Sequence, residues 1–230
     1  MNDIIDKRLV ELRKIMKREK LDAFIFPSTD PHNGEYVPEH WEGRKWISGF
    51  DGSAGTAVVT MTNAALWTDS RYFLAAEEQL KDTEFVLMKE RMPGTPTIAE
   101  WLGWSLADVD GAQVGLDGYV NFVGGVEKLI AELKRQGGIT VRTNFDPLVQ
   151  VWTDRPRIPE NEISLYPLAY SGETAKSKLA RIRQLLKKNG ACGILVSSLD
   201  DIAWTLNLRG SDVHCNPVFV AYMLLDGDKT

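Results

Sequence analysis

The segment TAVVTMTNAALWTDSRYFLAAEEQL, residues 56–80, defines the fold class of this chain. Its first residues are typical of a buried strand, and Ala64–Asp69 are typical of a second strand. The two are joined through Thr62 and Asn63, which suggests a hairpin turn. A helix is expected from Ser70 to Leu80. Strands that lead directly into a helix predict a layered α/β domain.

The same alternation of strands and helices continues on both sides of this segment. Thr97 and Glu100 form a capping-box pattern, which predicts that a helix begins there. Elsewhere, apolar runs predict strands, and apolar residues at helical spacing predict helices. Further strands are expected at 22–28, 84–89, 113–117, 139–144, 192–198 and 216–225, and further helices near 5–16, 126–138 and 173–190.

The beginning of the chain is repeated near its end. Ala23–Ser28 aligns with Gly193–Ser198. Trp46–Ser53 aligns with Trp204–Ser211, and the order of the predicted elements agrees. Although the identity between the copies is low, this order predicts a tandem duplication of one α/β domain.

The duplication sets the expected domain boundaries. We expect a first domain at residues 1–150, a proline-rich linker at 151–167, and the start of a second domain at 168–230. The first copy continues well past the strand that matches the last strand of the second. We therefore expect the second copy to be truncated, with an open sheet edge and exposed apolar surface, and the chain to be a fragment of a longer protein.

Composition excludes several classes of protein. The 230 residues are 43% hydrophobic and 26% charged, with a net charge of −5, and the basic residues are scattered, so a nucleic-acid surface is not expected. The charged N-terminus does not resemble a signal peptide, and no apolar run is long enough to predict a membrane span. Cys192 and Cys215 form no disulfide framework, which favours a reduced, cytoplasmic setting.

Histidines and acids give only weak indications of a metal site. None of His32, His40 and His214 stands at zinc-ligand spacing with a second ligand. The loop that carries Asp30, His32 and Glu35 could hold a cation, but an ordered polar loop is the favoured interpretation. The adjacent pair His214 and Cys215 is likewise interpreted as a packed or loop pair.

Two other patterns are assigned to local structure. Asp200 and Asp201 could form a carboxylate pair, but they are interpreted as caps of the helix that follows. The glycine-rich segment at residues 49–56, GFDGSAGT, lacks the spacing of a phosphate loop and precedes a strand. It is therefore interpreted as a tight, close-packed turn.

Arg71 is placed against the usual electrostatic preference. It is expected in the first turn of its helix, where the macrodipole favours an acid, with Asp69 or Ser70 as the N-cap. Spacing alone favours a salt bridge to Asp69 or to a carboxylate in a nearby loop. The alternative is an arginine at a strand-to-helix junction that binds a carboxylate or carbonyl from outside the domain.

Five stretches together resemble the three-domain Xaa-Pro aminopeptidases (aminopeptidase P) of the creatinase/prolidase pita-bread metallopeptidase family. The match extends over essentially the whole chain in the same order. The stretches are FPSTDPHNGEYVPE (26–39), RKWISGFDGSAGTAVVT (44–60), ALWTDSRYFLAAEEQL (65–80), VWTDRPRIP (151–159) and DIAWTLNLRGSDVHCNPVF (201–219).

The resemblance implies two related N-terminal α/β domains with mixed sheets and a ribonuclease-H-like motif. It also implies a C-terminal catalytic domain that holds two divalent metals, typically Mn²⁺, and hydrolyses the bond before proline. That domain is absent from this chain, so we expect no catalytic residue and no metal ligand here, and no activity of the fragment alone. The resemblance assigns substrate binding to Arg71. The implied partners are a proline-containing peptide, the chain's own catalytic domain, and further copies in a homo-oligomer.

Two alternatives stay open, one from another class of protein and one a different hydrolase of the family. The first is a non-catalytic peptide- or protein-binding module of a creatinase-fold, chaperone-like protein. The second is the N-terminal part of a prolidase that acts on dipeptides. The resemblance implies five metal ligands in the parent protein, two Asp, one His and two Glu. Their presence or absence would separate the first alternative from an aminopeptidase, and substrate length would separate the second.

Overall fold

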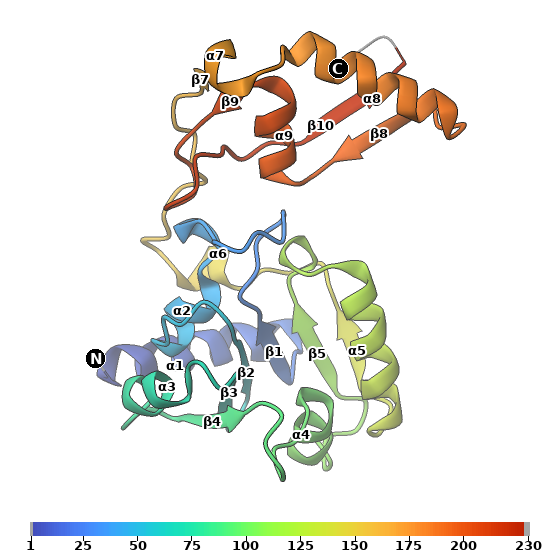
Figure 1. Ribbon diagram of the computed structural model, residues 1–230. Helices are drawn as coiled ribbons and strands as arrows, with labels where there is room; N and C mark the ends of the chain where they lie inside the picture. Colours follow the sequence, from blue (N-terminus) through green and yellow to red (C-terminus); the bar gives the residue numbers. More distant parts are fainter. Residues whose placement is uncertain (1, 228–230) are drawn as a thin grey trace. The chain divides into compact units, whose positions relative to one another are not determined.

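The chain is described by a computed structural model that covers residues 2–227. The described residues form two compact units (Figure 1). Unit 1 extends to Pro31 and resumes at Trp41–Pro156. Unit 2 comprises the loop His32–His40 and the chain from Arg157 onwards.

Unit 1 is built on a six-stranded mixed sheet in the order β4-β3-β2-β1-β5-β6. Strand β2 pairs antiparallel with both β1 and β3, while β1–β5, β5–β6 and β3–β4 are parallel. The predicted hairpin through Thr62 and Asn63 is confirmed, because Val59 pairs with Ala64 across it. The strands are β1 (Ala23–Phe26), β2 (Thr56–Thr60), β3 (Ala64–Thr68), β4 (Phe85–Lys89), β5 (Gln113–Leu116) and β6 (Thr140–Arg142).

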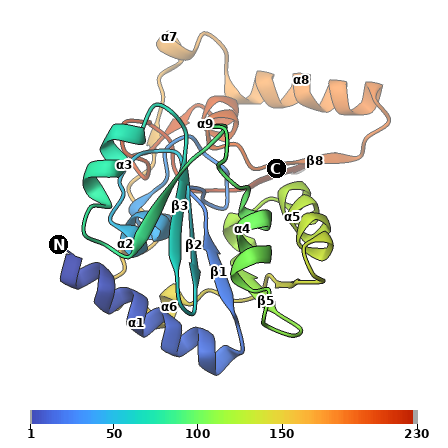
Figure 2. The ribbon, with the colours of Figure 1, turned by 90° about the horizontal axis from the view of Figure 1, so that it is seen from below.

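Helices cover both faces of this sheet, so unit 1 has three layers (Figure 2). One face packs against α1 (Asn2–Glu19), α2 (Gly43–Ser48), α3 (Phe73–Gln79) and α6 (Leu148–Val151), and the other packs against α4 (Ile98–Ser105) and α5 (Val123–Arg135). A 3₁₀ turn lies at Gly118–Val120, and another, at Glu39–Trp41, spans the end of the His32–His40 loop and the first residue of the resumed unit 1. The capping box of α4 is confirmed, since Thr97 and Glu100 exchange both of its hydrogen bonds. The sequence did not predict the short helix α2.

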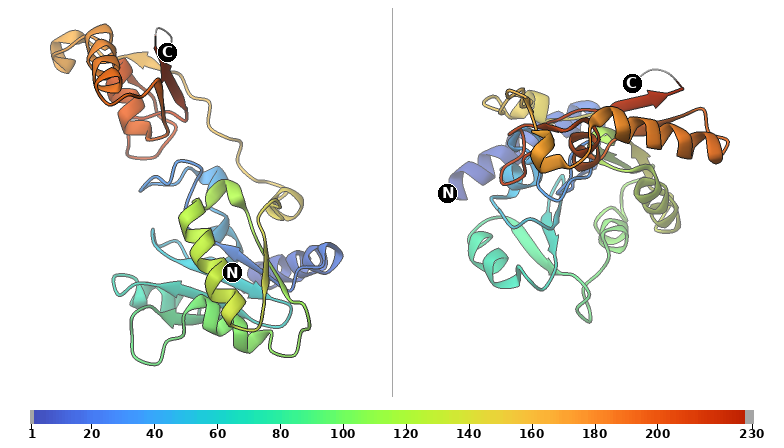
Figure 3. Two further views of the ribbon diagram at one scale, coloured as in Figure 1. Left: turned by 90° about the vertical axis from the view of Figure 1, so that its right-hand side faces the viewer. Right: turned by 45° about the horizontal axis from the view of Figure 1, so that its top comes forward.

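Unit 2 contains a shorter version of the same arrangement (Figures 1 and 3). Its elements are β7 (Ser164–Leu165), α7 (Leu168–Ser171), α8 (Ala175–Lys188), β8 (Gly193–Val196), α9 (Leu199–Leu206), β9 (Leu208–Arg209) and β10 (Met223–Asp226). Strand β8 pairs antiparallel with β10, and β7 pairs with β9. The predicted strand at 216–225 is wrong over its first part. A turn at Cys215, with φ +60°, and the bond from Val220 N–H to Asp212 hold that stretch in an irregular path.

Both units contain a long helix, an antiparallel strand pair and a short helix, which form a shared frame. The units agree at equivalent positions of this frame. In unit 1, Ile25 pairs with Val58, and in unit 2, Leu195 pairs with Leu224. Helix α2 ends at Gly49 in the left-handed conformation (φ +76°), and α9 ends at Asn207 in the same conformation (φ +52°). The fold therefore supports the duplication that the sequence alignment predicted.

Each unit also contains a contact between a cationic side chain and a tryptophan ring. The Arg8 guanidinium donates to the Trp46 carbonyl at 2.5 Å and lies 4.4 Å from the centre of its ring. The Lys178 ammonium donates to the Trp204 carbonyl at 2.7 Å and lies 4.0 Å from that ring. The cation thereby joins α1 to α2 in unit 1 and α8 to α9 in unit 2.

Candidate functional site

The candidate substrate residue Arg71 lies at the junction between β3 and α3, in unit 1. The expectation that it occupies the first turn of the helix is wrong, because α3 begins at Phe73 and Tyr72 is its N-cap residue. The Asp69 carboxylate accepts the Arg71 backbone N–H at 3.0 Å, and the Tyr72 N–H donates to the Asp69 carbonyl. This Asx-type turn places the arginine before the helix. Neither Asp69 nor Ser70 is the N-cap that was expected.

The Arg71 side chain forms the local salt bridge that spacing alone favours. Its Nε and Nη2 donate to the two carboxylate oxygens of Asp69 at 2.9 and 2.7 Å. These bonds lower the pKa of the Asp69 carboxyl to about 2. The Arg71 side chain is nevertheless 66% exposed. An exposed ion pair adds little to stability, about 0–1 kcal/mol, so the pair mainly orients the guanidinium.

The Tyr72 ring forms an aromatic platform for the Arg71 side chain. The Arg71 guanidinium lies 5.2 Å from the centre of the Tyr72 ring. The Tyr72 hydroxyl lies 2.7 Å from the Ser53 hydroxyl, and its ring packs edge-on against Phe50. A Cβ at Gly52 would lie 2.8 Å from the Tyr72 ring and 2.3 Å from that of Phe50. The glycine-rich segment is thus a close-packed turn, as predicted, and it forms the base of this platform.

A buried arginine that the sequence analysis did not single out organises this turn. Arg44, only 6% exposed, donates to the carbonyl oxygens of Phe50 (2.5 Å) and Gly52 and to the Ser28 hydroxyl (2.8 Å). Burial is the main cause that lowers its pKa to about 10, so it stays protonated at neutral pH. Arg44 stands between Gly43 and Lys45, so no side-chain pattern in the sequence marks it as a buried residue.

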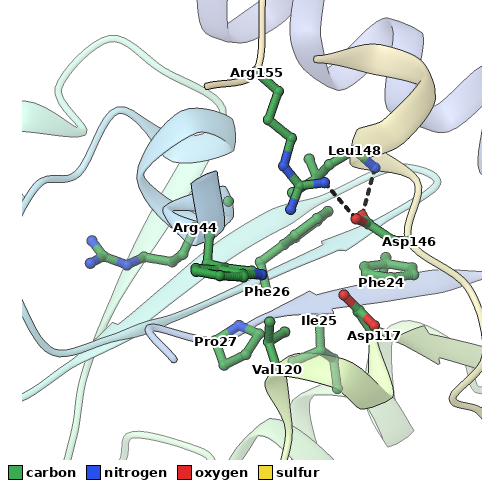
Figure 4. Close-up of a pocket in the computed structure, with 12 residues that line it drawn as sticks. Phe24, Ile25, Phe26, Pro27, Arg44, Asp117, Val120, Asp146, Leu148 and Arg155 are labelled. Carbon is green, nitrogen blue, oxygen red and sulfur yellow. Dashed lines mark hydrogen bonds and ion pairs between the residues drawn. The ribbon is translucent and has the colours of Figure 1, made fainter. Parts of the chain in front are cut away.

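A small cavity lies beside Arg44, at the carboxyl ends of β1 and β5 (Figure 4). Asp117 lines it, and burial is the main cause that raises the pKa of this carboxyl. Asp146 accepts the Leu148 N–H at 2.8 Å and an Arg155 N–H at 2.6 Å. The volume is about 20 Å³, which holds about one water molecule. The cavity is therefore too small to bind a peptide.

The metal-binding alternatives gain no support from the described residues. Among residues 2–227, no three His, Cys, Asp or Glu side chains gather in a group that could hold a metal ion. The His32 ring donates from Nδ1 to the Ser197 carbonyl at 2.9 Å, within unit 2.

The other weak candidates take structural roles. His214 and Cys215 are both exposed. The prediction that Asp200 and Asp201 cap their helix is wrong, because the Ser198 hydroxyl accepts the Asp201 N–H as the N-cap of α9. The two acids lie in the first turn of α9 instead, where their negative charges interact favourably with the helix dipole. Within the described part of the chain, no helix combines the length and apolar character that a membrane crossing requires.

The three-layer arrangement of unit 1 and the repetition of its frame in unit 2 define a known class of domain. A family model for the creatinase/prolidase N-terminal domain matches residues 8–147, and a second model with the same description matches residues 154–230. The chain therefore belongs to the creatinase/prolidase N-terminal domain family.

Two relatives within the family are similar to nearly the whole chain. The chain is 40% identical over 230 residues to aminopeptidase P2 of Arabidopsis thaliana, covering 98% of this chain and 32% of that protein. It is 41% identical over 225 residues to a probable Xaa-Pro aminopeptidase P of Aspergillus fumigatus, covering 97% and 34%.

A solved structure resembles the whole described fold. This is the X-prolyl aminopeptidase of Caenorhabditis elegans, described as a cytosolic enzyme with a di-nuclear active site. It matches with a TM-score of 0.87 and 31% identity, over 96% of this chain and 37% of that one. The present chain thus spans about a third of the length of these relatives.

Proposed function

We propose that this chain forms the two N-terminal, non-catalytic domains of a metal-dependent Xaa-Pro aminopeptidase. The likeness to the C. elegans X-prolyl aminopeptidase over almost the whole chain is the observation that carries the proposal. The parent protein would release the residue that precedes proline at a peptide N-terminus. That bond needs a dedicated enzyme, because proline has no backbone N–H and its ring restricts the chain.

Catalysis is assigned to a separate domain that would hold two divalent metals, Mn²⁺ by expectation. The N-terminal domains would shape access for peptides and take part in assembly of a homo-oligomer. We place the enzyme in the cytoplasm, as described for the C. elegans relative. The described residues of this chain would supply binding contacts and no metal ligand.

Arg71 is proposed to bind the peptide in the parent enzyme. Its Nε and Nη2 donate to the two carboxylate oxygens of Asp69, and the side chain is largely exposed. Asp69 fixes the plane of the group, and Tyr72 lies against it. An arginine held in this way is suited to a carboxylate or carbonyl of a bound peptide.

The test compares the 230-residue chain with the full-length parent, using an Xaa-Pro-Pro peptide and Mn²⁺. The chain alone should release no amino acid, and the parent should do so in a metal-dependent way. Arg71→Ala in the parent should lower kcat/KM about 10- to 150-fold, the equivalent of losing a charge-assisted contact worth about 1.5–3 kcal/mol. Unchanged kinetics on short and long peptides would refute the role.

Arg181→Ala is the matched control. Arg181 forms a similar two-bond pair with Glu173 in unit 2, at 3.0 and 2.7 Å, and its side chain is also exposed. Its removal should leave kcat/KM unchanged. A parent that binds peptides without metal-dependent hydrolysis would instead favour the binding-module alternative, and a preference for dipeptides would favour a prolidase.

A further inference from the structure

Every hydrogen bond described for the Arg44 side chain helps to hold the glycine-rich turn at residues 49–56. Its guanidinium donates to the carbonyl oxygens of Phe50 and Gly52 and to the Ser28 hydroxyl. That hydroxyl donates to the Gly55 carbonyl at 2.6 Å. Among the described residues, Arg44 forms no ion pair with a carboxylate, and its side chain points away from the two acids that line the small cavity (Figure 4).

A buried arginine of this kind is unfavourable for stability alone. Burial removes the cation from water, and the acids Glu42 and Asp51 raise the pKa of Arg44 less than this burial lowers it. An apolar side chain of similar volume would avoid the desolvation cost. The guanidinium adds a planar group of donors that holds two carbonyl groups of one turn in a fixed geometry. The position of that turn is therefore what Arg44 supplies.

The turn fixes the Tyr72 ring, on which Arg71 rests. Phe50 packs edge-on against that ring, with centres 6.0 Å apart, and the Ser53 and Tyr72 hydroxyls are 2.7 Å apart. Gly52 leaves no free space beneath the ring, since a Cβ there would lie 2.8 Å from it. The Arg71 guanidinium lies 5.2 Å from the centre of the same ring. A displaced turn would therefore displace the support of Arg71.

A second connection joins the turn to the helix that follows Arg71. The Asp51 backbone N–H donates to the Gln79 side-chain oxygen at 3.1 Å, and the Gln79 side-chain amide donates to the Asp51 carboxylate at 2.7 Å. Gln79 is the last residue of α3. The turn is thus bound to both ends of the segment from Tyr72 to Gln79.

We propose that Arg44 is a positioning residue for peptide binding, which acts through the turn and Tyr72 to hold the Arg71 guanidinium in one orientation. An arginine that is already held loses less rotamer freedom when it binds a carbonyl or carboxylate of a peptide. The inference rests on the proposed function, in that Arg71 binds the peptide.

A double-mutant cycle in the full-length parent tests this coupling. Arg44→Lys keeps the charge but replaces the planar fork by a single ammonium. It should lower kcat/KM for an Xaa-Pro-Pro peptide about 5- to 30-fold, chiefly through KM, as expected when the rotamer freedom of one arginine is lost on binding. In the Arg71→Ala background it should cause no further loss, because the residue that it positions is gone.

Arg13→Lys is the matched control. The Arg13 side chain is 16% exposed and donates to the Thr60 carbonyl at 2.9 Å, at the end of β2 opposite the turn. This variant also exchanges a mostly buried arginine that holds a backbone carbonyl of unit 1, and it should leave kcat/KM unchanged.

A measurement without substrate follows Arg71 itself. In the 230-residue chain, ¹⁵N relaxation of the Arg71 Nε–H group should give a lower order parameter for Arg44→Lys than for the unmodified and Arg13→Lys chains. Ser53→Ala removes the hydroxyl partner of Tyr72 at an exposed position and should lower the order parameter in the same direction. This second variant tests the link even where Arg44→Lys does not fold.

Two results would overturn the proposal. The first is a loss of kcat/KM from Arg44→Lys that persists undiminished in the Arg71→Ala background, which is the result expected of a purely structural role. The second is an Arg71 order parameter that neither Arg44→Lys nor Ser53→Ala changes. An Arg71→Ala variant with normal kinetics would refute the proposed role of Arg71 and this inference with it, whereas either of the first two results refutes the inference alone.

Discussion

Units 1 and 2 share one frame but bury it to different extents. Both join a long helix to a short one through a cation on a tryptophan, Arg8 on Trp46 between α1 and α2, and Lys178 on Trp204 between α8 and α9. In unit 1 a second helical layer covers the far face of the sheet, whereas that face of unit 2 is open at Leu195. Equivalent apolar residues therefore differ in burial because of their neighbours and not because of their type.

The comparison also separates the frame from the site. Unit 1 alone carries the platform of Tyr72 and Asp69 under Arg71, since those residues follow β3, and the described part of unit 2 has no counterpart of β3. The shared frame holds the long and short helices of each unit together. The added elements of unit 1 explain why the candidate binding residue occurs once.

The largest effect is expected when one charge is placed at the same register position in each unit. Val58→Lys buries an ammonium in unit 1 and should cost about 4 kcal/mol or more, enough to unfold that unit. Leu224→Lys places the same group on an exposed surface and should change stability by about 0.5 kcal/mol at most. Urea denaturation followed by circular dichroism measures both. Equal losses would mean that the two faces are equally covered in the isolated chain.

The cation on each tryptophan should give the next largest effect. Lys178 is 1% exposed and also donates to the Asn207 side chain at 2.7 Å. Lys178→Met removes both hydrogen bonds and leaves the Asn207 side-chain oxygen without this donor, and it should cost about 1–3 kcal/mol. Arg8→Met removes one bond from a half-buried side chain and should cost about 0.5–1.5 kcal/mol.

Thermal unfolding of the two variants, with Lys178→Arg as the charge-preserving control, checks this ranking. The control should recover part of the loss in unit 2, because it keeps a charged donor. A larger loss for Arg8→Met than for Lys178→Met would contradict the ranking.

Much of the fold was predictable because local pattern decides it. The capping box at Thr97 specifies its helix start through two reciprocal bonds, and the hairpin at Asn63 follows from two adjacent apolar runs. The start of α3 was not predictable from helix propensity. There the Asp69 side chain accepts the Arg71 N–H and forms a turn that competes with the first turn of the helix.

The candidate site was only partly predictable for the same physical reason. Motif similarity identified Arg71, and spacing indicated its pairing with Asp69. The role of Arg44 depends on carbonyl groups of Phe50 and Gly52, which face it only after the turn has folded. Backbone acceptors leave no trace in the side-chain pattern, so sequence reasoning missed this residue.

A smaller effect is expected at the helix ends that the two units share. Gly49 and Asn207 both adopt left-handed conformations. Gly49→Ala should destabilise unit 1 by about 1 kcal/mol, because a Cβ is unfavourable there. Gly49→Asn should cost less, since asparagine tolerates this conformation and unit 2 uses it. Chemical denaturation of both variants measures the difference, and an equal cost would show that the side chain of Asn207 and not its backbone explains its presence.

The smallest effect concerns the two exposed ion pairs, Asp69–Arg71 in unit 1 and Glu173–Arg181 in unit 2. Hydrogen bonds from the arginines lower the pKa of each carboxyl to about 2. A lowered pKa means that each pair contributes stability above the unfolded pKa and loses it as the pH falls through about 2. Carboxyl ¹³C chemical shifts during an acid titration should give both midpoints. Arg71→Ala should raise only the Asp69 midpoint, and Arg181→Ala only that of Glu173. A normal Asp69 midpoint in the unmodified chain would mean that the pair does not form in solution, and the oriented guanidinium proposed to bind peptide would lose its support.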